Sequence, residues 1–421
     1  MKINTIELTN VRGFTHAKLE FQPGFNLIVG INGVGKTTVL ECLRVVLSNF
    51  LSEATTARQK KESLGIYDIQ IGKESLQVNA AIDCNKEDFS FVMSKQKKKT
   101  KTIDTENIRA QTYDVADRAE FRPNIPKEYK KAENQPLGIF YSAYRSLMNE
   151  ERPAKSQTVG GQATAFAEAL SPKREFTIRL FADWLFAQEE LAKEDTSLLN
   201  KIESIKEAIY TFLPVLSNLK VIKDIRKENN TFSITKDGKE LSFQQLSEGE
   251  RSMLALVFDT ARRLTIANTK LKNPLEGEAI VLIDELDLHL HPKWQRTIVS
   301  NLKRTFPNCQ FIATTHSPQI ISSVLPENIQ IIKKFEIDRT VKSFGLDINW
   351  ILKFIMEDSD RLKESEDAIA SVQKLVDEAE FEAARSLIDK YKQQDLYLEE
   401  WIIFEARMSH LEMFDDNEED N

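Results

Sequence analysis

The sequence predicts an α/β protein with a parallel-sheet core. Three short segments, FNLIV at residues 25–29, AIVLI at 279–283 and QFIAT at 310–314, are almost wholly apolar. Parallel strands that are buried on both faces have this composition. Stretches with 3.6-residue apolar periodicity lie between them, and alternation of such strands with helices is typical of a sheet covered by helices.

Composition and cysteine content narrow the class of protein. The 421 residues are 41% hydrophobic and 29% charged, as in globular proteins. The opening MKINTIELTN reads as a strand and lacks the basic and apolar regions of a signal peptide, and no run approaches the ~18 apolar residues of a membrane span. Cys42, Cys84 and Cys309 are too dispersed for a disulfide framework or a zinc site. We therefore expect a cytoplasmic protein without membrane contact.

Charge is distributed unevenly. From Ile351 onward there are 21 acidic and 8 basic residues, whereas the whole chain has a net charge of −8. The acidic C-terminal region is either a docking or assembly surface or a solvated cap. The lysine cluster KQKKKTK, residues 95–101, either contacts phosphates or forms a solvated hairpin tip, because the strand-like FSFVM runs into it.

The first half of the chain is expected to be rich in strands. INTIEL and AKLEF precede the strand at residues 25–29, and a helix follows through about Leu51. IYDIQI, LQVNAAI and FSFVM, within residues 66–94, read as further strands. Residues 95–135 are polar and contain prolines, which predicts loops. LGIFYSAY at 137–144 predicts another strand.

Helices are expected to dominate the second half. The insertion at about 150–222 has helical periodicity, and the hairpin FSITKDGKELSF turns at Asp237-Gly238. Ser247 and Glu250 form a capping box that starts a helix. A helical hairpin lies in the acidic tail. We expect a first domain at 1–345, which includes the insertion, and a C-terminal helical region at 346–421.

GINGVGKT, residues 30–37, is the strongest functional signal. It fits G-x-x-x-x-G-K-[ST] between an apolar strand and a helix, as this phosphate-binding motif requires. Glycines and loop amides allow close approach of phosphates, the lysine reaches the β- and γ-phosphates, and the following hydroxyl binds Mg²⁺. We expect ATP and Mg²⁺ as cofactors. The expected ATP-binding residues are Gly30, Asn32, Gly33, Gly35, Lys36, Thr37 and Thr38.

Two further segments complete a hydrolytic site. AIVLI ends in Asp284-Glu285; we expect Asp284 to hold Mg²⁺ with Thr37, and Glu285 to orient or deprotonate the attacking water. His316 follows the next apolar strand, at the edge where α/β sheets bind ligands. We expect it near the γ-phosphate. His289 and His291 would share one face of a strand, but the sequence presents no third metal ligand for them.

The order of these motifs resembles ABC-type ATPases of the RecF/SMC/OLD branch. LSEGE at 246–250 lies between the phosphate loop and the acidic pair, and LTNVRGF followed by FQPGFNLIVGINGVGKTTVLECL is similar to RecF and SMC N-termini. The resemblance implies a P-loop ATPase head that dimerises around ATP. It also implies that Arg12 faces the nucleotide, although a surface arginine is the alternative. The segment expected to act in trans comprises Ser247, Glu248, Gly249 and Glu250.

A closer resemblance is to the PtuA-type ATPases of Septu and retron-associated anti-phage systems. FADWLF, LSEGERSMLAL, THSPQIISSV and SFGLDINWILKFIM carry it. It implies an ATP-hydrolysing subunit of a bacterial antiviral defence complex that forms a homodimer through ATP and regulates a partner HNH-type nuclease, PtuB in that group. A higher homo-oligomer and contact with DNA remain open.

The sequence departs from other members of the branch. It lacks coiled-coil arms, and after His316 no glutamate-bearing strand precedes a D-x-D pair, so no nuclease centre is expected. Tyr144-Arg145 is the candidate for the Q-loop region. The alternative functions are a RecF-like DNA-repair ATPase and an ATPase scaffold that sequesters a toxin-like effector, as AriA of PARIS systems does. A transporter ATPase is disfavoured.

Overall fold

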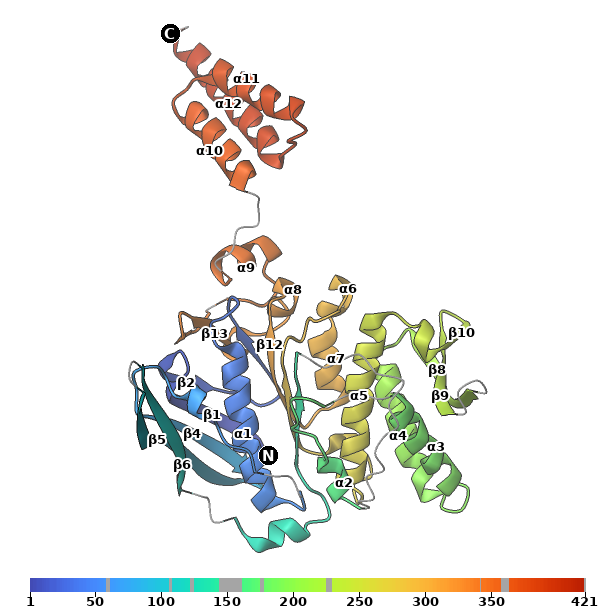
Figure 1. Ribbon diagram of the computed structural model, residues 1–421. Helices are drawn as coiled ribbons and strands as arrows, with labels where there is room; N and C mark the ends of the chain where they lie inside the picture. Colours follow the sequence, from blue (N-terminus) through green and yellow to red (C-terminus); the bar gives the residue numbers. More distant parts are fainter. Residues whose placement is uncertain are drawn as a thin grey trace. The chain divides into compact units, whose positions relative to one another are not determined.

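The computed structural model describes residues 1–57, 61–105, 108–121, 125–143, 161–174, 178–224, 229–340, 342–356 and 363–419. The chain divides into two units, Met1–Ile351 and Leu352–Asn421 (Figure 1). None of the helices in these ranges is long and apolar enough to cross a membrane.

A six-stranded sheet forms the centre of the first unit. Its order is β14 (Glu336–Asp338), β13 (Ile329–Lys333), β3 (Phe25–Val29), β12 (Cys309–Thr315), β11 (Ala279–Ile283) and β7 (Leu137–Tyr141). All neighbours are parallel except β13 and β14. Every residue of β3, β7, β11 and β12 is buried, which confirms the predicted parallel core. Because the strands are parallel, their carboxyl ends meet at one edge.

An antiparallel sheet made from the N-terminal part of the chain packs over the first helix. Its order is β2 (Phe14–Glu20), β1 (Lys2–Val11), β4 (Ser75–Cys84), β5 (Glu87–Thr105) and β6 (Ile108–Phe121). Helix α1 (Lys36–Ala54) shares one apolar core with β1, β4 and the central sheet. Figure 1 shows α1 on one side of the central sheet and α5 (Glu248–Ala267) and α7 (Ile298–Thr305) on the other.

Two sequence-based expectations in this region are wrong. Residues 95–105 and 108–121 form strands rather than loops, and 66–68 form a 3-10 turn rather than a strand. The lysine cluster is therefore no hairpin tip. Lys95 is buried and donates to the Leu64 carbonyl, and Lys97 donates to the Lys73 carbonyl. The ladder between β4 and β5 extends as far as Gln96, and β6 pairs with the lysines that follow. This pairing outweighs the weak strand preference of lysine.

The insertion covers the free side of α5. It contains α2 (Ala163–Phe166), α3 (Ile178–Leu191) and α4 (Ser197–Phe212), followed by β8 (Leu216–Asp224), β9 (Asn229–Lys236) and β10 (Lys239–Ser242). Residues 216–222, expected to be helical, belong to β8 because Pro214 ends the preceding helix and β9 pairs with the segment. The turn at Asp237-Gly238 is confirmed: both residues have positive φ, of 49° and 77°.

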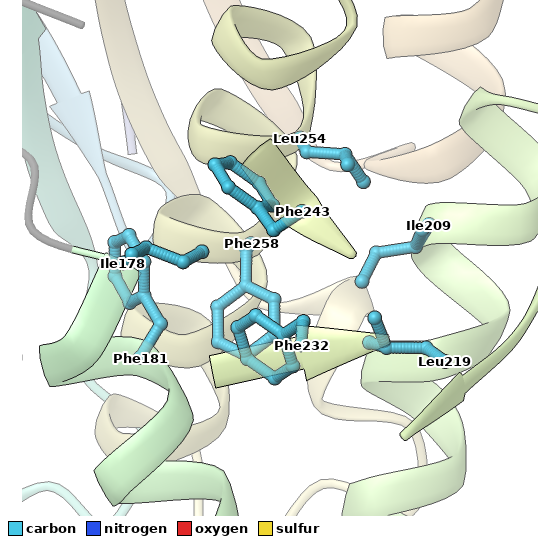
Figure 2. Close-up of a pocket in the computed structure, with 8 residues that line it drawn as sticks. All are labelled: Ile178, Phe181, Ile209, Leu219, Phe232, Phe243, Leu254 and Phe258. Carbon is cyan, nitrogen blue, oxygen red and sulfur yellow. The ribbon is translucent and has the colours of Figure 1, made fainter. Parts of the chain in front are cut away.

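An apolar cluster joins the insertion to α5 (Figure 2). Phe258 of α5 lies at its centre, with ring centroids 5.0 Å from Phe181 and 5.4 Å from Phe232. The other lining residues are Ile178, Ile209, Leu219, Phe243 and Leu254. These contacts hold α5 against the insertion at Leu254 and Phe258, about two to three turns from its start.

The second unit is a three-helix domain. Helix α9 (Ile348–Phe354) spans the division between the units, and α10 (Lys363–Asp377), α11 (Phe381–Gln393) and α12 (Glu399–Glu419) follow. The expected helical hairpin is α10 and α11, and α12 adds a third helix to it. Trp401 is buried in its core, stacked on Tyr391 at 5.8 Å, and its indole nitrogen donates to the Leu396 carbonyl at 3.0 Å.

Replacement of Trp401 by alanine should unfold the second unit selectively. Loss of a buried tryptophan costs about 3–5 kcal/mol, which is large for so small a core. Hydrogen exchange followed by mass spectrometry should show lost protection in α10–α12 and unchanged protection in β11. Ile402→Ala is the control, because Ile402 is 71% exposed. Equal loss of protection in both variants would contradict the assignment of the core.

Candidate functional site

The glycine-rich loop lies between β3 and α1, at the carboxyl edge of the central sheet. Gly33 and Gly35 have φ of 83° and 101°, in the left-handed region that disfavours side chains. A Cβ atom on Gly35 would also lie 2.5 Å from the Phe14 ring. The loop therefore requires glycine at Gly35 for two reasons, and its backbone is left free to wrap around an anion.

Lys36 is the cation of this loop. Its ammonium donates to the carbonyls of Gly30 at 2.8 Å and Ile31 at 3.0 Å. Burial lowers the pKa of Lys36, while the carboxylates of Asp284 and Glu285 oppose that shift. The ammonium is held over the loop, where phosphate oxygens of a nucleotide would replace the loop carbonyls as its partners.

Asp284 joins three elements at the edge of the sheet. Its Oδ2 accepts a hydrogen bond from Thr37 of α1 at 3.0 Å, and its Oδ1 accepts one from Thr314 of β12 at 2.6 Å. The structure thus brings together the two residues expected to hold Mg²⁺. A hydroxyl and a single carboxylate suit Mg²⁺, which keeps several water ligands and is completed by substrate phosphates. Thr314 was not expected from the sequence.

The histidine pair after Asp284 does not form a metal site. In the described part of the chain, no group of three His, Cys, Asp or Glu residues could hold a metal ion. The segment is a series of turns rather than a strand. The imidazole of His291 accepts from the Lys293 amide at 3.2 Å, which caps α6 (Pro292–Gln295), and His289 lies 3.8 Å from Glu248.

Glu285 and His316 lie at the ends of adjacent strands. Glu285 has a φ of 51°, and its amide donates to the Thr314 hydroxyl at 2.8 Å. The amide of His316 donates to Asp287 at 3.2 Å. Burial, and then the Lys36 ammonium, lower the pKa of His316. A neutral imidazole results at neutral pH, and it can donate one hydrogen bond and accept another.

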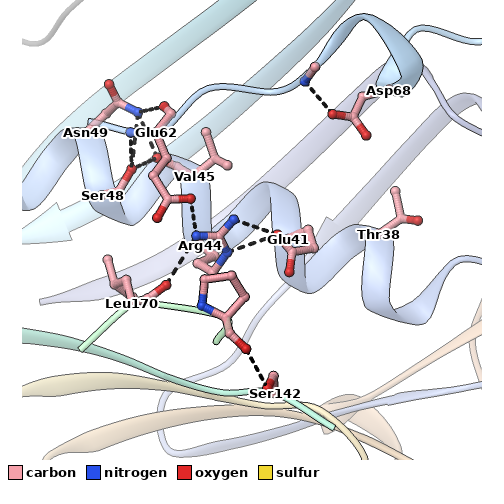
Figure 3. Close-up of polar contacts among 12 residues, drawn as sticks. Thr38, Glu41, Arg44, Val45, Ser48, Asn49, Glu62, Asp68, Ser142 and Leu170 are labelled. Atoms are coloured by element: carbon pink, nitrogen blue, oxygen red, sulfur yellow. Dashed lines mark hydrogen bonds and ion pairs between the residues drawn. The ribbon is translucent and has the colours of Figure 1, made fainter. Parts of the chain in front are cut away.

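Arg12 is held beside the first turn of α1. It has a φ of 49° in the β1–β2 turn, and its guanidinium donates to Asp68 at 2.7 Å and to the Thr38 hydroxyl at 3.2 Å. Asp68 in turn accepts from the Gly65 amide at 2.5 Å (Figure 3). Asp68 escaped the sequence analysis because a lone acid in IYDIQI carries no motif. It points Arg12 at the phosphate-binding helix.

A second polar cluster surrounds Arg44 and Asn49, further along α1 from the phosphate loop (Figure 3). The buried guanidinium of Arg44 donates to Glu41 at 2.7 Å, to Glu62, and to the Leu170 carbonyl at 3.2 Å. The Asn49 amide donates to the Glu62 carbonyl at 2.8 Å. These bonds fasten α1 to the segments before β4 and after α2, so they set where the phosphate loop can lie.

The LSEGE segment forms the start of α5. The capping box is confirmed: the Glu250 amide donates to Ser247 Oγ at 3.4 Å, and Glu250 Oε2 accepts from the Ser247 amide at 3.0 Å. Glu250 is buried and also pairs with Lys236 at 2.6 Å. A Cβ atom on Gly249 would lie 2.5 Å from the His289 carbonyl. The segment after Asp284 therefore packs directly against the start of α5.

The start of α5 and the phosphate loop are separate within one chain. In Figure 1 the N-terminal ends of α1 and α5 lie on opposite sides of β12, with α7 also between them. The candidate Q-loop residues Tyr144 and Arg145 lie outside the described residues.

Lys36→Ala should weaken nucleotide binding strongly. The ammonium would form charge-assisted hydrogen bonds with phosphate, worth about 1.5–3 kcal/mol, so affinity should fall about 10- to 100-fold. Fluorescent ATP titration measures it, with Lys18→Ala of the exposed β2 face as the control. If Lys36→Ala bound ATP as tightly as the wild type, the assignment of Lys36 to the nucleotide site would be wrong.

His316 should make the protein lose stability on acidification. Because its folded pKa lies below the ordinary value of 6.5, the unfolded chain takes up the proton first as pH falls. Stability from the neutral imidazole is therefore complete above pH 6.5 and declines below it. Urea unfolding between pH 5 and 7 should show a shallower decline for His316→Asn than for the control His16→Asn. Identical pH profiles would contradict the buried, neutral state.

The chain is similar to several known proteins. A family model described as AAA ATPase domain matches residues 1–321. The chain is 30% identical to the probable ATPase of retron Vc95 from Vibrio cholerae serotype O1 biovar El Tor, over 89% of this chain and 82% of the relative. It is 25% identical to the Septu protein PtuA of Bacillus thuringiensis, over 94% of each chain.

Among solved structures, an SMC head bound to the C-winged helix domain of ScpA covers 82% of this chain and 98% of its own, with 16% identity and a TM-score of 0.45. Family match, relatives and nucleotide-binding loop lead to one assignment: the chain belongs to the AAA ATPase domain family.

Proposed function

We propose that the protein hydrolyses ATP with Mg²⁺ at sites shared between two copies of the chain. One observation carries this proposal: the Asp284 carboxylate lies beside the phosphate loop and accepts hydrogen bonds from two hydroxyls. The Thr37 hydroxyl is 3.0 Å from it and the Thr314 hydroxyl is 2.6 Å from it. Lys36 binds the β- and γ-phosphates, Thr37 and Asp284 hold the metal, and Glu285 activates the attacking water. A bound Mg²⁺ would stabilise charge on the transferred phosphoryl group.

His316 and Arg12 complete the half of the site that each chain supplies. His316, neutral at physiological pH, donates a hydrogen bond to the γ-phosphate without competing with Lys36 for its charge. Arg12, oriented by Asp68, faces the nucleotide next to Thr38. The role of His316 follows from its position at the carboxyl edge of the central sheet, and the role of Arg12 from its position beside the first turn of α1.

The second half of each site is the start of α5 from another chain. The helix N-terminus carries free amides and positive potential, which favour a phosphate. Ser247 and Gly249 lie in the first turn, whereas the Glu250 carboxylate is buried in the cap. Since the phosphate loop of the same chain lies beyond β12 (Figure 1), the phosphate that this end binds comes from a partner. ATP thus joins a homodimer.

The biological role that we propose is regulation of an HNH-type nuclease in bacterial antiviral defence. Relatives that align with most of this chain carry the names retron ATPase and Septu protein PtuA. Only a ligand that binds two states differently can shift the equilibrium between them. Here the γ-phosphate is that ligand, because only in the dimer does it contact both the phosphate loop of one chain and the start of α5 of the other. The acidic C-terminal unit, with 21 acidic and 8 basic residues from Ile351 onward, is the proposed docking surface for the nuclease.

Glu285→Gln should retain ATP binding and lose turnover. The amide keeps the shape of the side chain but cannot accept the proton of the attacking water, so kcat should fall about 10²- to 10⁴-fold. Light scattering should then show ATP-bound dimers accumulating. Glu327→Gln is the control, because Glu327 is exposed and lies just before the start of β13. Turnover near the wild-type rate would contradict the catalytic assignment.

Ser247→Arg should spare ATP binding by single chains and block ATP-dependent dimers. The larger cation fills the space into which the partner's γ-phosphate must enter. Ser242→Arg is a matched control, because Ser242 also caps a turn, bonding Gln245 at 3.2 Å, five residues earlier. Sedimentation with and without ATP distinguishes them. Equal dimerisation of the two variants would remove Ser247 from the interface.

A further inference from the structure

A buried ionic cluster connects β7, α5 and Arg174, which precedes α3 in the sequence. Asp259 of α5 lies 2.9 Å from the Arg174 guanidinium and accepts from Arg263 at 3.0 Å. The Tyr141 hydroxyl donates to Asp259 at 3.1 Å and lies 2.8 Å from the Thr260 hydroxyl. Each of these five side chains is at most 9% exposed. We call these residues the Asp259 cluster.

Charges this deeply buried need a complete set of partners. Arg263 also donates to the carbonyls of Ala165 and Ala167, and the Arg174 guanidinium lies 4.9 Å from the centre of the Tyr141 ring. Although burial opposes it, Arg174 and Arg263 hold the pKa of Asp259 below its ordinary value, and burial raises the pKa of Tyr141. Replacement of such a group by apolar residues is often neutral for stability, so stability alone does not explain its presence.

Tyr141 links this cluster to the metal-binding strand. It is the last residue of β7 and lies opposite Ile283 in the parallel ladder. Its carbonyl accepts from the Asp284 amide at 2.8 Å. One residue therefore bonds the backbone of Asp284 with its own backbone, and bonds α5 with its side chain.

α5 carries the other half of the nucleotide site at its first turn. Asp259 and Thr260 lie about three turns along the helix from Ser247. A helix is stiff over that length, so its orientation at Asp259 determines where Ser247 lies. Tyr141 thus links two parts of the proposed sites. Its backbone bonds Asp284, which would hold Mg²⁺ in one site, and its hydroxyl bonds α5, whose start would complete the other site.

We infer that Tyr141 and Asp259 are positioning residues, which set the orientation of α5 relative to Asp284 so that Ser247 and Asp284 of one chain fit the two ATP sites at once. This inference rests on the proposed function. Neither residue touches the nucleotide. They act through Asp284 on one side and through α5 on the other, and a tyrosine is required because phenylalanine cannot bond Asp259 or Thr260.

Tyr141→Phe tests the inference in the full-length protein. The ring and its contact with Arg174 stay, while the hydroxyl bonds to α5 are lost. We expect ATP affinity of the single chain within about twofold of wild type and kcat about tenfold lower, since small misplacements of reacting groups have effects of that size or larger. ATP-dependent dimers should form at correspondingly higher protein concentration.

The matched control is Tyr210→Phe. The Tyr210 hydroxyl accepts from the Leu219 amide at 2.7 Å, so this change also removes a hydrogen bond, but one between α4 and β8 rather than one to α5. It should lower Tm and leave kcat unchanged. If Tyr141→Phe behaves in the same way, the cluster is only structural and the inference is wrong.

Thr260→Val provides a second route, should Tyr141→Phe fold poorly. It removes the hydroxyl partner with almost no change in volume, and it should lower kcat in the same direction. The double variant should be no slower than the slower single variant, because both changes break one contact. Additive loss would contradict a shared role. A wild-type protein without ATP turnover would overturn the proposed function as well, whereas normal wild-type turnover with unaffected variants overturns only this inference.

Discussion

The arrangement of the first unit around the phosphate loop depends on the hydrogen bonds that the Asp284 carboxylate accepts. Thr37 brings the start of α1 to it, and Thr314 brings the end of β12 to it. Its backbone amide is bonded to the end of β7. Such convergence is possible only because β3, β12, β11 and β7 are parallel and end at one edge. The group of residues that we propose for metal binding and catalysis therefore follows from strand order.

Two routes within the chain connect the start of α5 with Asp284, the two proposed half-sites. On the surface, the segment after Asp284 packs against the start of α5, with His289 beside Glu248 and Gly249. In the interior, Tyr141 bonds Asp284 through its backbone and α5 through its hydroxyl. The interior route consists of short polar contacts and the surface route of close packing, so we expect a shift at one proposed half-site to alter the other.

Sequence reasoning reached the features that depend on local pattern. The parallel strands, the Ser247 capping box and the Asp237-Gly238 turn are as predicted, and Thr37 and Asp284 meet although 247 residues separate them. Features that depend on distant partners escaped it. β5 continues through a run of lysines because β4 pairs with it as far as Gln96 and β6 pairs with the lysines that follow. Asp68 and Thr314 gain their roles only from the residues that folding places beside them.

The central claim is that each ATP site uses two chains, and mixing two defective proteins tests it most directly. Lys36→Ala lacks a working phosphate loop, and Ser247→Arg lacks a working partner segment. In a mixed dimer, the phosphate loop of the Ser247→Arg chain and the start of α5 of the Lys36→Ala chain form one intact site. The account predicts no ATP hydrolysis by either protein alone and hydrolysis that rises to a maximum near equimolar mixing. No recovery at any ratio, with both proteins folded, would contradict it.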